Sequence, residues 1–323
     1  MVDCPPAPVP RVKTGEAQIG NPMSSITEYF GIPGDVPFLD IEVDADNLAF
    51  LDLHAIRLST GPEPFRAEAL RQADSFMSTI VAYVHAGSGS SFELGRALLS
   101  QFSEPWETRL GMSKDGYFGH GGSDGVGADI WDALVTDRRA LVEVGLLSQL
   151  DRIPLYVSGI GSDITSDLTT RVTYSALAGF TAAMLGEYPQ LSYGALPVDA
   201  KMWNPETRDW VVRSVELPSA NGKPLLLVPR DWARRNPLVT AGRFHKKSVL
   251  GHVQDVEATV SSVTGRVTRS PKWALQQRQD LRNVHDSNAR VSLSALDLGQ
   301  DLPSAFEAYL AGWLREQDRR HKA

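Results

Sequence analysis

Two long segments of the chain, 62–87 and 164–187, carry apolar residues at every third or fourth position. Phe76, Ile80 and Val84 keep this spacing in the first segment, and Gly87 follows the last of them. The spacing predicts amphipathic helices, because positions three and four apart share one helix face. Any fold for this chain must therefore provide an apolar surface for two long helices.

Shorter apolar runs lie before, between and after these helices and predict strands. They cover 36–43, 48–56, 154–160, 197–203, 210–218 and 223–229. Turn residues at 44–47 and 204–209 predict that two pairs of runs form hairpins. Because strands and helices alternate irregularly, the sequence predicts an α+β or mixed α/β fold, in which amphipathic helices pack a small sheet with hairpins.

The predicted organisation has three parts. Residues 1–22 are rich in proline and are interpreted as a flexible leader. Residues 23–240 form the mixed α/β core, and residues 241–323 form a helical, basic C-terminal region that packs on it, with helices over 243–261, 271–284 and 303–321.

Composition and missing motifs exclude several classes of protein. Cys4 is the only cysteine, so neither an internal disulfide nor a cysteine-built metal site is possible. No apolar run approaches the roughly 18 residues of a membrane span, so a cytoplasmic location is expected. The sequence also lacks the motifs of Walker ATPases, zincins, simple Rossmann enzymes and α/β-hydrolases.

Charge is unevenly distributed along the chain. Residues 1–200 contain 12 Lys and Arg against 26 Asp and Glu, whereas residues 201–323 contain 20 against 13. The basic half predicts an anionic partner, either DNA or RNA or an acidic protein. The alternative is that the two halves attract each other or form solvated helix faces. The residues expected to bind phosphates are Arg230, Arg234, Arg235, Lys246 and Lys247.

The glycine-rich passage 111–127 precedes a predicted helix. Gly121, Gly122 and Gly125 would allow a phosphate to approach backbone amides at the helix N-terminus. A mobile or packing loop, with Ser123 or Asp124 as the helix cap, explains the passage equally.

Asp163 and Asp167 lie one helical turn apart at the start of the predicted helix 164–187. They could cap the helix and interact with its dipole. They could instead share a Mg²⁺ ion, which prefers oxygen ligands. In that hypothesis Asp199 supplies a third ligand, and Asp163, Asp167 and Asp199 hold the metal.

Asp199 and Lys201 have the acidic-x-Lys spacing found in one class of nucleases. Residues two apart on a strand share a face, so Asp199 could hold the metal while Lys201 assists attack on the phosphate. With 39 acidic residues among 323 positions, this spacing arises about once by chance. Its position between the aspartate pair and the basic segment is the only support for a catalytic role.

Several tryptophans lie near the basic segment. Trp203, Trp210, Trp232 and Trp273 could stack nucleic-acid bases. They could equally anchor the core.

Several stretches resemble a poorly characterised group of bacterial proteins associated with mobile elements and phage defence. They are "DVPFLDIEVDADNLAFLDL", "EPWETRLGMSKDGYFGHGGSDGVGADIWDAL", "GIGSDITSDLTT", the Trp-flanked hairpin ending "VELP" and "KPLLLVPRDWARR". The resemblance covers most of residues 35–260 and implies that Asp163 and Asp167 belong to a recurrent element. It implies no cofactor or mechanism.

These observations predict a protein that acts on nucleic acid, most concretely a Mg²⁺-dependent nuclease or phosphodiesterase in a defence or mobile-element context. The alternative is a non-catalytic adaptor or sensor that binds nucleic acid or an acidic, operon-encoded protein partner. In that case the aspartates are helix caps.

Overall fold

The computed structural model describes residues 24–87, 89–101, 104–111 and 123–321. Its strands are β1 Phe50–Leu51, β2 Leu196–Asn204, β3 Asp209–Leu217, β4 Ser219–Ala220, β5 Lys223–Pro224, β6 Ala233–Arg234, β7 Thr259–Val260 and β8 Val267–Thr268. Its α-helices are α1 Ile26–Phe30, α2 Leu53–Leu58, α3 Phe65–Ala86, α4 Ser90–Ser100, α5 Ser123–Val135, α6 Arg139–Glu143, α7 Ile153–Tyr156, α8 Ser162–Val172, α9 Tyr174–Glu187, α10 Ala241–Phe244, α11 Leu250–Val256, α12 Lys272–Gln277, α13 Gln279–Arg282, α14 Val284–Asp297 and α15 Leu302–His321.

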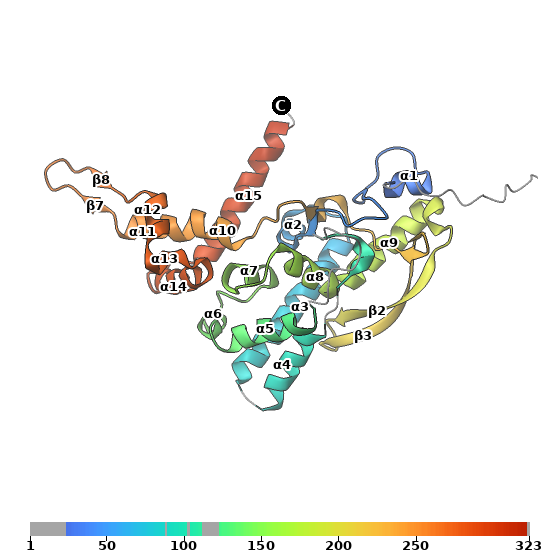
Figure 1. Ribbon diagram of the computed structural model, residues 1–323, viewed down its shortest axis with the longest axis horizontal. Helices are drawn as coiled ribbons and strands as arrows, with labels where there is room; N and C mark the ends of the chain where they lie inside the picture. Colours follow the sequence, from blue (N-terminus) through green and yellow to red (C-terminus); the bar gives the residue numbers. More distant parts are fainter. Residues whose placement is uncertain (1–23, 88, 102–103, 112–122, 322–323) are drawn as a thin grey trace, which may run out of the picture.

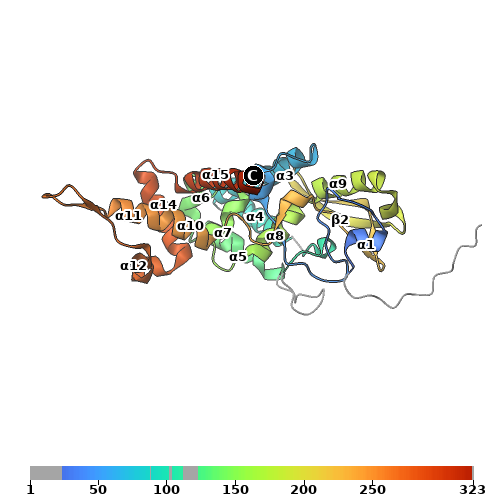
Figure 2. The same cartoon turned by 90° about the horizontal axis from the view of Figure 1, so that it is seen from above.

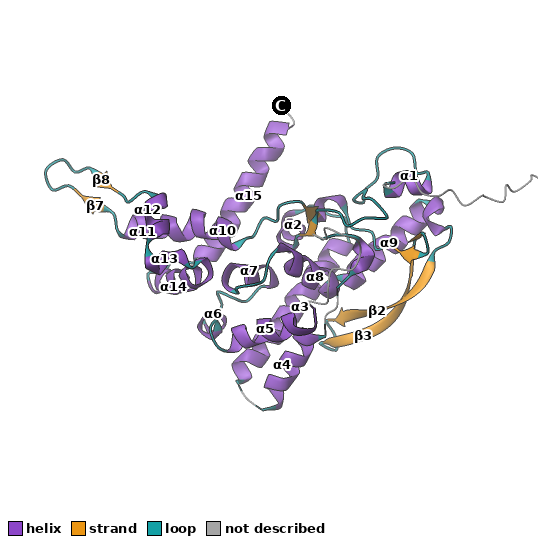
Figure 3. Cartoon of the chain, viewed as in Figure 1, coloured by secondary structure: helices purple, strands orange, loops and turns teal. Residues whose placement is uncertain are grey.

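Each sheet in this part of the chain is an antiparallel pair of strands, and helices make up most of the remaining structure (Figure 3). The predicted α+β class, with hairpins, packed helices and a helical C-terminal region, is therefore confirmed. The predicted leader, 1–22, lies outside the described residues.

Helix α3 runs through the centre of the core (Figure 1). Ala69, Ala73, Phe76, Ile80 and Val84 form its buried face, and each is no more than 1% exposed. This face contacts α4, α8 and α9, and the helix ends where Gly87 adopts φ +74°. The helix predicted over 62–87 is thus confirmed, and it terminates at a glycine because only glycine adopts the left-handed conformation without strain.

The long hairpin of β2 and β3 packs against α3 through tryptophans. Trp203 pairs with Trp210 across the two strands, and their ring centroids lie 5.8 Å apart. Phe76 of α3 packs edge-on against Trp203 at 5.0 Å, and the indole of Trp210 donates to the Leu98 carbonyl oxygen at 3.0 Å. The predicted hairpin is confirmed, and these two tryptophans are core anchors rather than exposed stacking surfaces.

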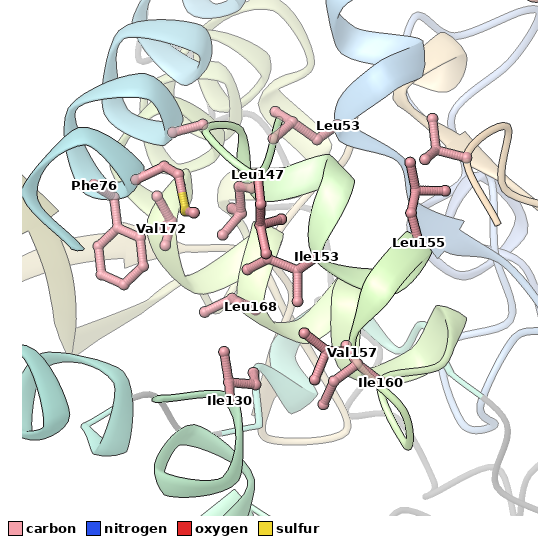
Figure 4. Packing of buried hydrophobic residues seen from close by; sticks show 14 of the residues in the cluster. Leu53, Phe76, Ile130, Leu147, Ile153, Leu155, Val157, Ile160, Leu168 and Val172 are labelled. Atoms are coloured by element: carbon pink, nitrogen blue, oxygen red, sulfur yellow. The ribbon is translucent and has the colours of Figure 1, made fainter. Parts of the chain in front are cut away.

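The segment 154–187 differs from its prediction in two ways. The run 154–160 is not a strand: its first residues belong to α7, where Pro154 lies in the first turn and needs no hydrogen bond from its nitrogen. The helix predicted over 164–187 is two helices, α8 and α9, separated at Thr173. A short run that is buried on all sides, as Figure 4 shows for Leu155 and Val157, has no periodicity that distinguishes a strand from a helix.

The hairpin predicted over 36–56 is wrong. The first run pairs with a distant segment instead, since the amide of Leu39 donates to the Val228 carbonyl oxygen at 2.8 Å. The second run contributes only β1, which pairs with β6. The Asp52 carboxylate then accepts hydrogen bonds from the amides of His54 and Ala55 and so begins α2. Of the strand predicted over 223–229, only β5 forms.

Helices α4 and α5 approach each other closely at two glycines. A Cβ atom at Gly127 would lie 1.9 Å from the Leu99 carbonyl oxygen, and one at Gly95 would lie 2.2 Å from the Trp131 ring. Helix α4 begins at Ser90, and its N-cap Gly89 provides no side-chain cap. The glycines therefore serve helix packing here.

The C-terminal region is helical as predicted, apart from one arm. A π-helix, His245–Val249, joins α10 to α11, and helices α12–α15 follow the arm. Strands β7 and β8 form a hairpin that projects from the body of the molecule in both views (Figures 1 and 2), where the sequence predicts helix up to residue 261. Residues 259–270 are exposed along the whole of this arm. No described helix combines the length and apolar character that a membrane span requires.

Candidate functional site

The turn 159–161 and the first turn of α8 form one wall of a hollow in the surface. Gly159 adopts φ +83°, and Gly161 is the N-cap of α8 without a side-chain acceptor for the first amides. Asp163 lies inside the first turn and is exposed, so the cap predicted from Asp163 does not form. This helix N-terminus therefore presents backbone N–H groups and the positive end of the helix dipole.

A cavity of about 320 Å³ opens beside this helix end. Apolar residues from three parts of the chain form most of its walls, and a few polar groups interrupt them. The apolar residues are Leu51, Leu53, Pro154, Ile160, Pro237, Val239 and Ala241, and the polar ones are Asp52, Asp151, Ser162, Thr165, Thr240 and His285. Small-molecule sites have this combination of apolar walls and few polar groups.

A buried polar network lies behind the cavity. Asp151 is 3% exposed, and its Oδ2 lies 3.1 Å from His54 Nδ1 and 3.4 Å from Arg57 Nε. Burial by itself raises the pKa of Asp151, but the hydrogen bond to His54 and the charge of Arg57 outweigh burial and hold that pKa below its usual range. The other carboxylate oxygen, Oδ1, and Nε2 of His54 have no hydrogen-bond partner among the described residues. Asp151 is thus an ionised group with one acceptor left over.

Asp52 is also buried in the cavity wall, but three backbone amides already donate hydrogen bonds to its carboxylate. Oδ1 accepts from the amides of His54 and Ala55, and Oδ2 accepts from the amide of Leu238 at 2.7 Å. Burial raises the pKa of Asp52, while these amides oppose the rise. Asp52 is therefore a structural cap that joins α2 to the segment before α10.

Two further hollows continue from the cavity, and all three share Thr240. One, of about 660 Å³, is lined by Gly161, Ser162, Asp163, Arg235 and Arg243 among others, and the second, of about 490 Å³, is lined by Arg243, Lys246, Lys247 and Tyr309. We call these two hollows the basic groove. No ion pair joins its four cations, Arg235, Arg243, Lys246 and Lys247, to a carboxylate in the described part of the chain.

Two of these cations have other defined contacts. The guanidinium of Arg243 donates to the carbonyl oxygens of Pro237 and Leu238, and Lys247 Nζ lies 4.0 Å from the centre of the Tyr309 ring. These contacts orient the side chains without neutralising them, so the groove keeps a positive charge that can attract anions.

A group of carboxylates lies on the other side of Asp163. Burial, together with the nearby charges of Asp163 and Glu104, raises the pKa of Asp167 to about 8. Burial and the charges of Asp163 and Asp46 raise the pKa of Glu104 as well. The pair Asp163 and Asp167 therefore belongs to a strongly acidic patch, which the sequence did not reveal because Glu104 and Asp46 are distant in the chain.

The predicted metal ligands are not gathered into one group. Across residues 24–87, 89–101, 104–111 and 123–321, no set of three or more His, Cys, Asp or Glu side chains is arranged to hold a metal ion. Asp199 is exposed on β2, and Lys201 Nζ donates to Oε1 of Gln101, the C-cap of α4, at 3.3 Å. The catalytic roles of Asp199 and Lys201 stay predictions, and neither residue lines the groove or the cavity.

The predicted phosphate-binding residues divide into two sets. Arg235, Lys246 and Lys247 line the basic groove. Arg230 is instead paired with Asp35, and Arg234 lies in β6 beside a separate hollow. Arg234 and Arg235 line different hollows because neighbouring residues of an extended segment point to opposite sides, whereas Arg230 belongs to the preceding 3-10 helix.

The predicted glycine site can be followed only in part. Gly121 and Gly122 lie outside the described residues. Gly125 is exposed within α5, and nothing lies within 4 Å of the position a side chain would take. It is not a residue of the cavity or the basic groove.

Several residues of this site have no signal in the sequence. His54 and Asp151 are 97 positions apart, and only the fold brings them together. Arg243 and Thr240 lie within a few positions of the predicted basic residues. The high density of positive charge after residue 230 is therefore the signal that the sequence offers for these two residues.

The comparison with protein families identifies a domain in the chain and gives no activity for it. The family model described as "Domain of unknown function (DUF8370)" matches residues 33–240. No curated protein and no solved structure matches the chain.

Proposed function

We propose that the chain, which belongs to the DUF8370 family, binds nucleic acid along the basic groove. The observation that carries this proposal is the continuity of the hollows around Thr240, with Arg235, Arg243, Lys246 and Lys247 along one path. Phosphate contacts supply most of the affinity in nucleic-acid binding and need cations that are not already neutralised. Within the described residues, no ion pair neutralises the groove cations.

The projecting arm of β7 and β8 is also basic. Between residues 258 and 272 there is no acidic residue, while Arg266, Arg269 and Lys272 are basic. Arg269 is paired with Asp255 on α11, so part of the charge is compensated. An exposed basic hairpin is a suitable element to follow a nucleic-acid backbone beyond the groove.

Mg²⁺-dependent cleavage of a phosphodiester is a second candidate, favoured by the carboxylates beside the groove. Asp163 lines the same hollow as Arg235 and Arg243, and Asp167 lies one turn further along α8. Mg²⁺ in phosphate-processing sites is held by one or two carboxylates and by the substrate phosphates. Asp163 and Asp167 would supply the protein ligands in such a site.

A non-catalytic adaptor uses the groove alone. In this alternative the protein binds nucleic acid, or an acidic protein partner, in a defence or mobile-element setting, and the acidic patch takes no part in chemistry. Binding and cleavage assays distinguish the catalytic candidate from the adaptor.

The binding test is fluorescence anisotropy with labelled single-stranded and double-stranded oligonucleotides over a range of salt concentrations. The double variant Lys246→Glu/Lys247→Glu is expected to lose about tenfold or more in affinity and to show a weaker dependence on salt. Arg213→Glu, an exposed arginine on β3, is the control for charge. If both proteins bind like the unmodified chain, the groove is not the binding surface.

The cleavage test uses plasmid DNA and single-stranded RNA with Mg²⁺ or Mn²⁺, with and without EDTA. Cutting that is abolished in Asp167→Asn but retained in Glu216→Gln, an exposed carboxylate on β3, would establish catalysis. Asp199→Asn shows whether the hairpin aspartate takes part. Binding without any cutting would assign the adaptor role.

A further inference from the structure

The geometry points to a site for one nucleotide at the N-terminus of α8, with the base in the 320 Å³ cavity and its phosphate in the adjoining hollow of the basic groove. This inference rests on the proposed binding of nucleic acid and specifies which part of a strand the cavity receives. The cavity and the hollow share Gly161, Ser162 and Thr240, so a single ligand can occupy both.

The phosphate position follows from the helix end and its cations. Helix α8 has 11 residues, and its N-cap Gly161 offers no side chain to the first amides. Arg235 and Arg243 line the same hollow as Gly161, Ser162 and Ile164 of this helix end. Asp163 lines it too, so the two arginines and the helix dipole must offset one negative charge. Backbone amides at a helix N-terminus, combined with arginine, are a common arrangement for phosphate.

The base position follows from Asp151, independently of the helix end. This side chain is 3% exposed and lines the cavity, and its Oδ1 has no hydrogen-bond partner among the described residues. His54 and Arg57 both contact the other oxygen, Oδ2, and leave Oδ1 available. A buried acceptor without a donor is costly, and an N–H group of a ligand would satisfy it. Each nucleobase carries N–H donors on its edge.

The cavity walls fit the faces of a base. Leu51, Ile160 and Val239 supply apolar surface around the acceptor, and the volume lies at the lower end of small-molecule sites, about 300–1,000 Å³. Proteins that take a base out of its stack read its edge by hydrogen bonds and enclose its faces with apolar side chains. A sugar phosphate has no flat apolar faces and would leave these walls uncovered.

The test is calorimetric titration of the full chain with the four 5′-mononucleotides, ribose 5-phosphate and inorganic phosphate. We expect one mononucleotide per chain, bound about tenfold or more tightly than ribose 5-phosphate. Val239→Phe fills the cavity and is expected to remove this difference, whereas Val212→Phe, the same change at an exposed position of β3, leaves it intact. Equal affinity for ribose 5-phosphate and the mononucleotides would overturn the inference, as would full binding by Val239→Phe.

A single-stranded oligonucleotide with one 2-aminopurine provides a measurement that needs no variant. Its fluorescence rises when that base leaves the stack, so an increase on binding supports the site and an unchanged signal overturns it. Anisotropy of the same strand separates the two proposals. If salt-dependent strand binding persists without mononucleotide binding, the cavity proposal fails and the groove survives. If the Lys246→Glu/Lys247→Glu variant also binds the strand normally, both fail.

Discussion

His54 Nδ1 lies 3.1 Å from Asp151 Oδ2, and both side chains are buried although 97 positions separate them. Arg57 approaches the same carboxylate from α2 and also donates to Asp74 at 2.6 Å. One buried carboxylate thus connects α2 to the turn that precedes α7. The connection gives a direct prediction about stability.

Asp151→Ala is expected to lower the free energy of unfolding by about 1–3 kcal/mol, because it leaves the buried His54 Nδ1 without its hydrogen-bond partner and removes one of the two carboxylates that pair with Arg57. Urea denaturation followed by tryptophan fluorescence measures the change. Asp255→Ala, which removes an exposed ion pair with Arg269, is the control and should cost about 0–1 kcal/mol. Equal costs for the two variants would show that the buried network does not stabilise the fold.

Asp167 predicts how stability depends on pH. Its pKa is about 8 in the folded protein against 3.8 as the ordinary value, so the folded state binds the proton more tightly between these limits. The free energy of unfolding should therefore fall as the pH rises from about 4 to 8, by at most about 1.4 kcal/mol per pH unit from this group.

The Asp167→Asn variant isolates this effect. Its stability should exceed that of the unmodified chain at pH 8 and match it near pH 4, as measured by urea denaturation at each pH. Glu216→Gln, on the surface of β3, should keep the original pH dependence. A parallel shift of Asp167→Asn at all pH values would contradict the raised pKa.

Gly127→Ala is expected to destabilise the protein by about 1–3 kcal/mol, since overpacking a tight contact costs this much. A Cβ atom there would meet the Leu99 backbone at 1.9 Å. At Gly186 in α9 nothing lies within 4 Å, so Gly186→Ala should be neutral or stabilise by up to about 1 kcal/mol. Thermal unfolding of the two variants measures the contrast, and a stabilised Gly127→Ala would show that α4 and α5 are not in close contact.

Removal of the β7–β8 arm is expected to change the affinity for nucleic acid without changing the stability of the fold. Replacing residues 259–268 with a short Gly-Ser turn removes only exposed residues, so the free energy of unfolding should change by less than about 1 kcal/mol. Affinity for long oligonucleotides should fall, while affinity for short ones stays the same, because only a long strand reaches both groove and arm. Anisotropy with strands of two lengths tests this, and an equal loss for both lengths would place the arm within the groove site instead.

The parts of the fold that the sequence predicted correctly are those with a long pattern. Helix α3 and the β2–β3 hairpin have many periodic positions, and the Trp203–Trp210 pair fixes the register. The strand predicted before α8 is wrong because residues 154–157 are all buried, and so short a buried segment has no exposed side to reveal its period. The arm was not predicted because its residues are exposed, so no apolar pattern marks it.

The residues of the candidate site were predictable from the sequence only where positively charged residues are dense. Arg235, Lys246 and Lys247 were identified because they belong to a basic stretch of the chain. Asp151 has an ordinary sequence context, and its role depends on a contact with His54 that only the tertiary structure creates. The role of Asp199, predicted from a two-residue spacing, stays a prediction, and its side chain is exposed on β2.

The basic groove has one side in the segment matched by the family and the other in the helices that follow it. Arg235 and α8 lie within residues 33–240, whereas Arg243, Lys246 and Lys247 come after Thr240. A ligand bound in the groove as proposed would therefore contact both parts of the chain and would stabilise their arrangement by the free energy of its binding. If a ligand binds in the groove as proposed, displacing α10 and the π-helix would move Arg243, Lys246 and Lys247 away from Arg235 and weaken its binding.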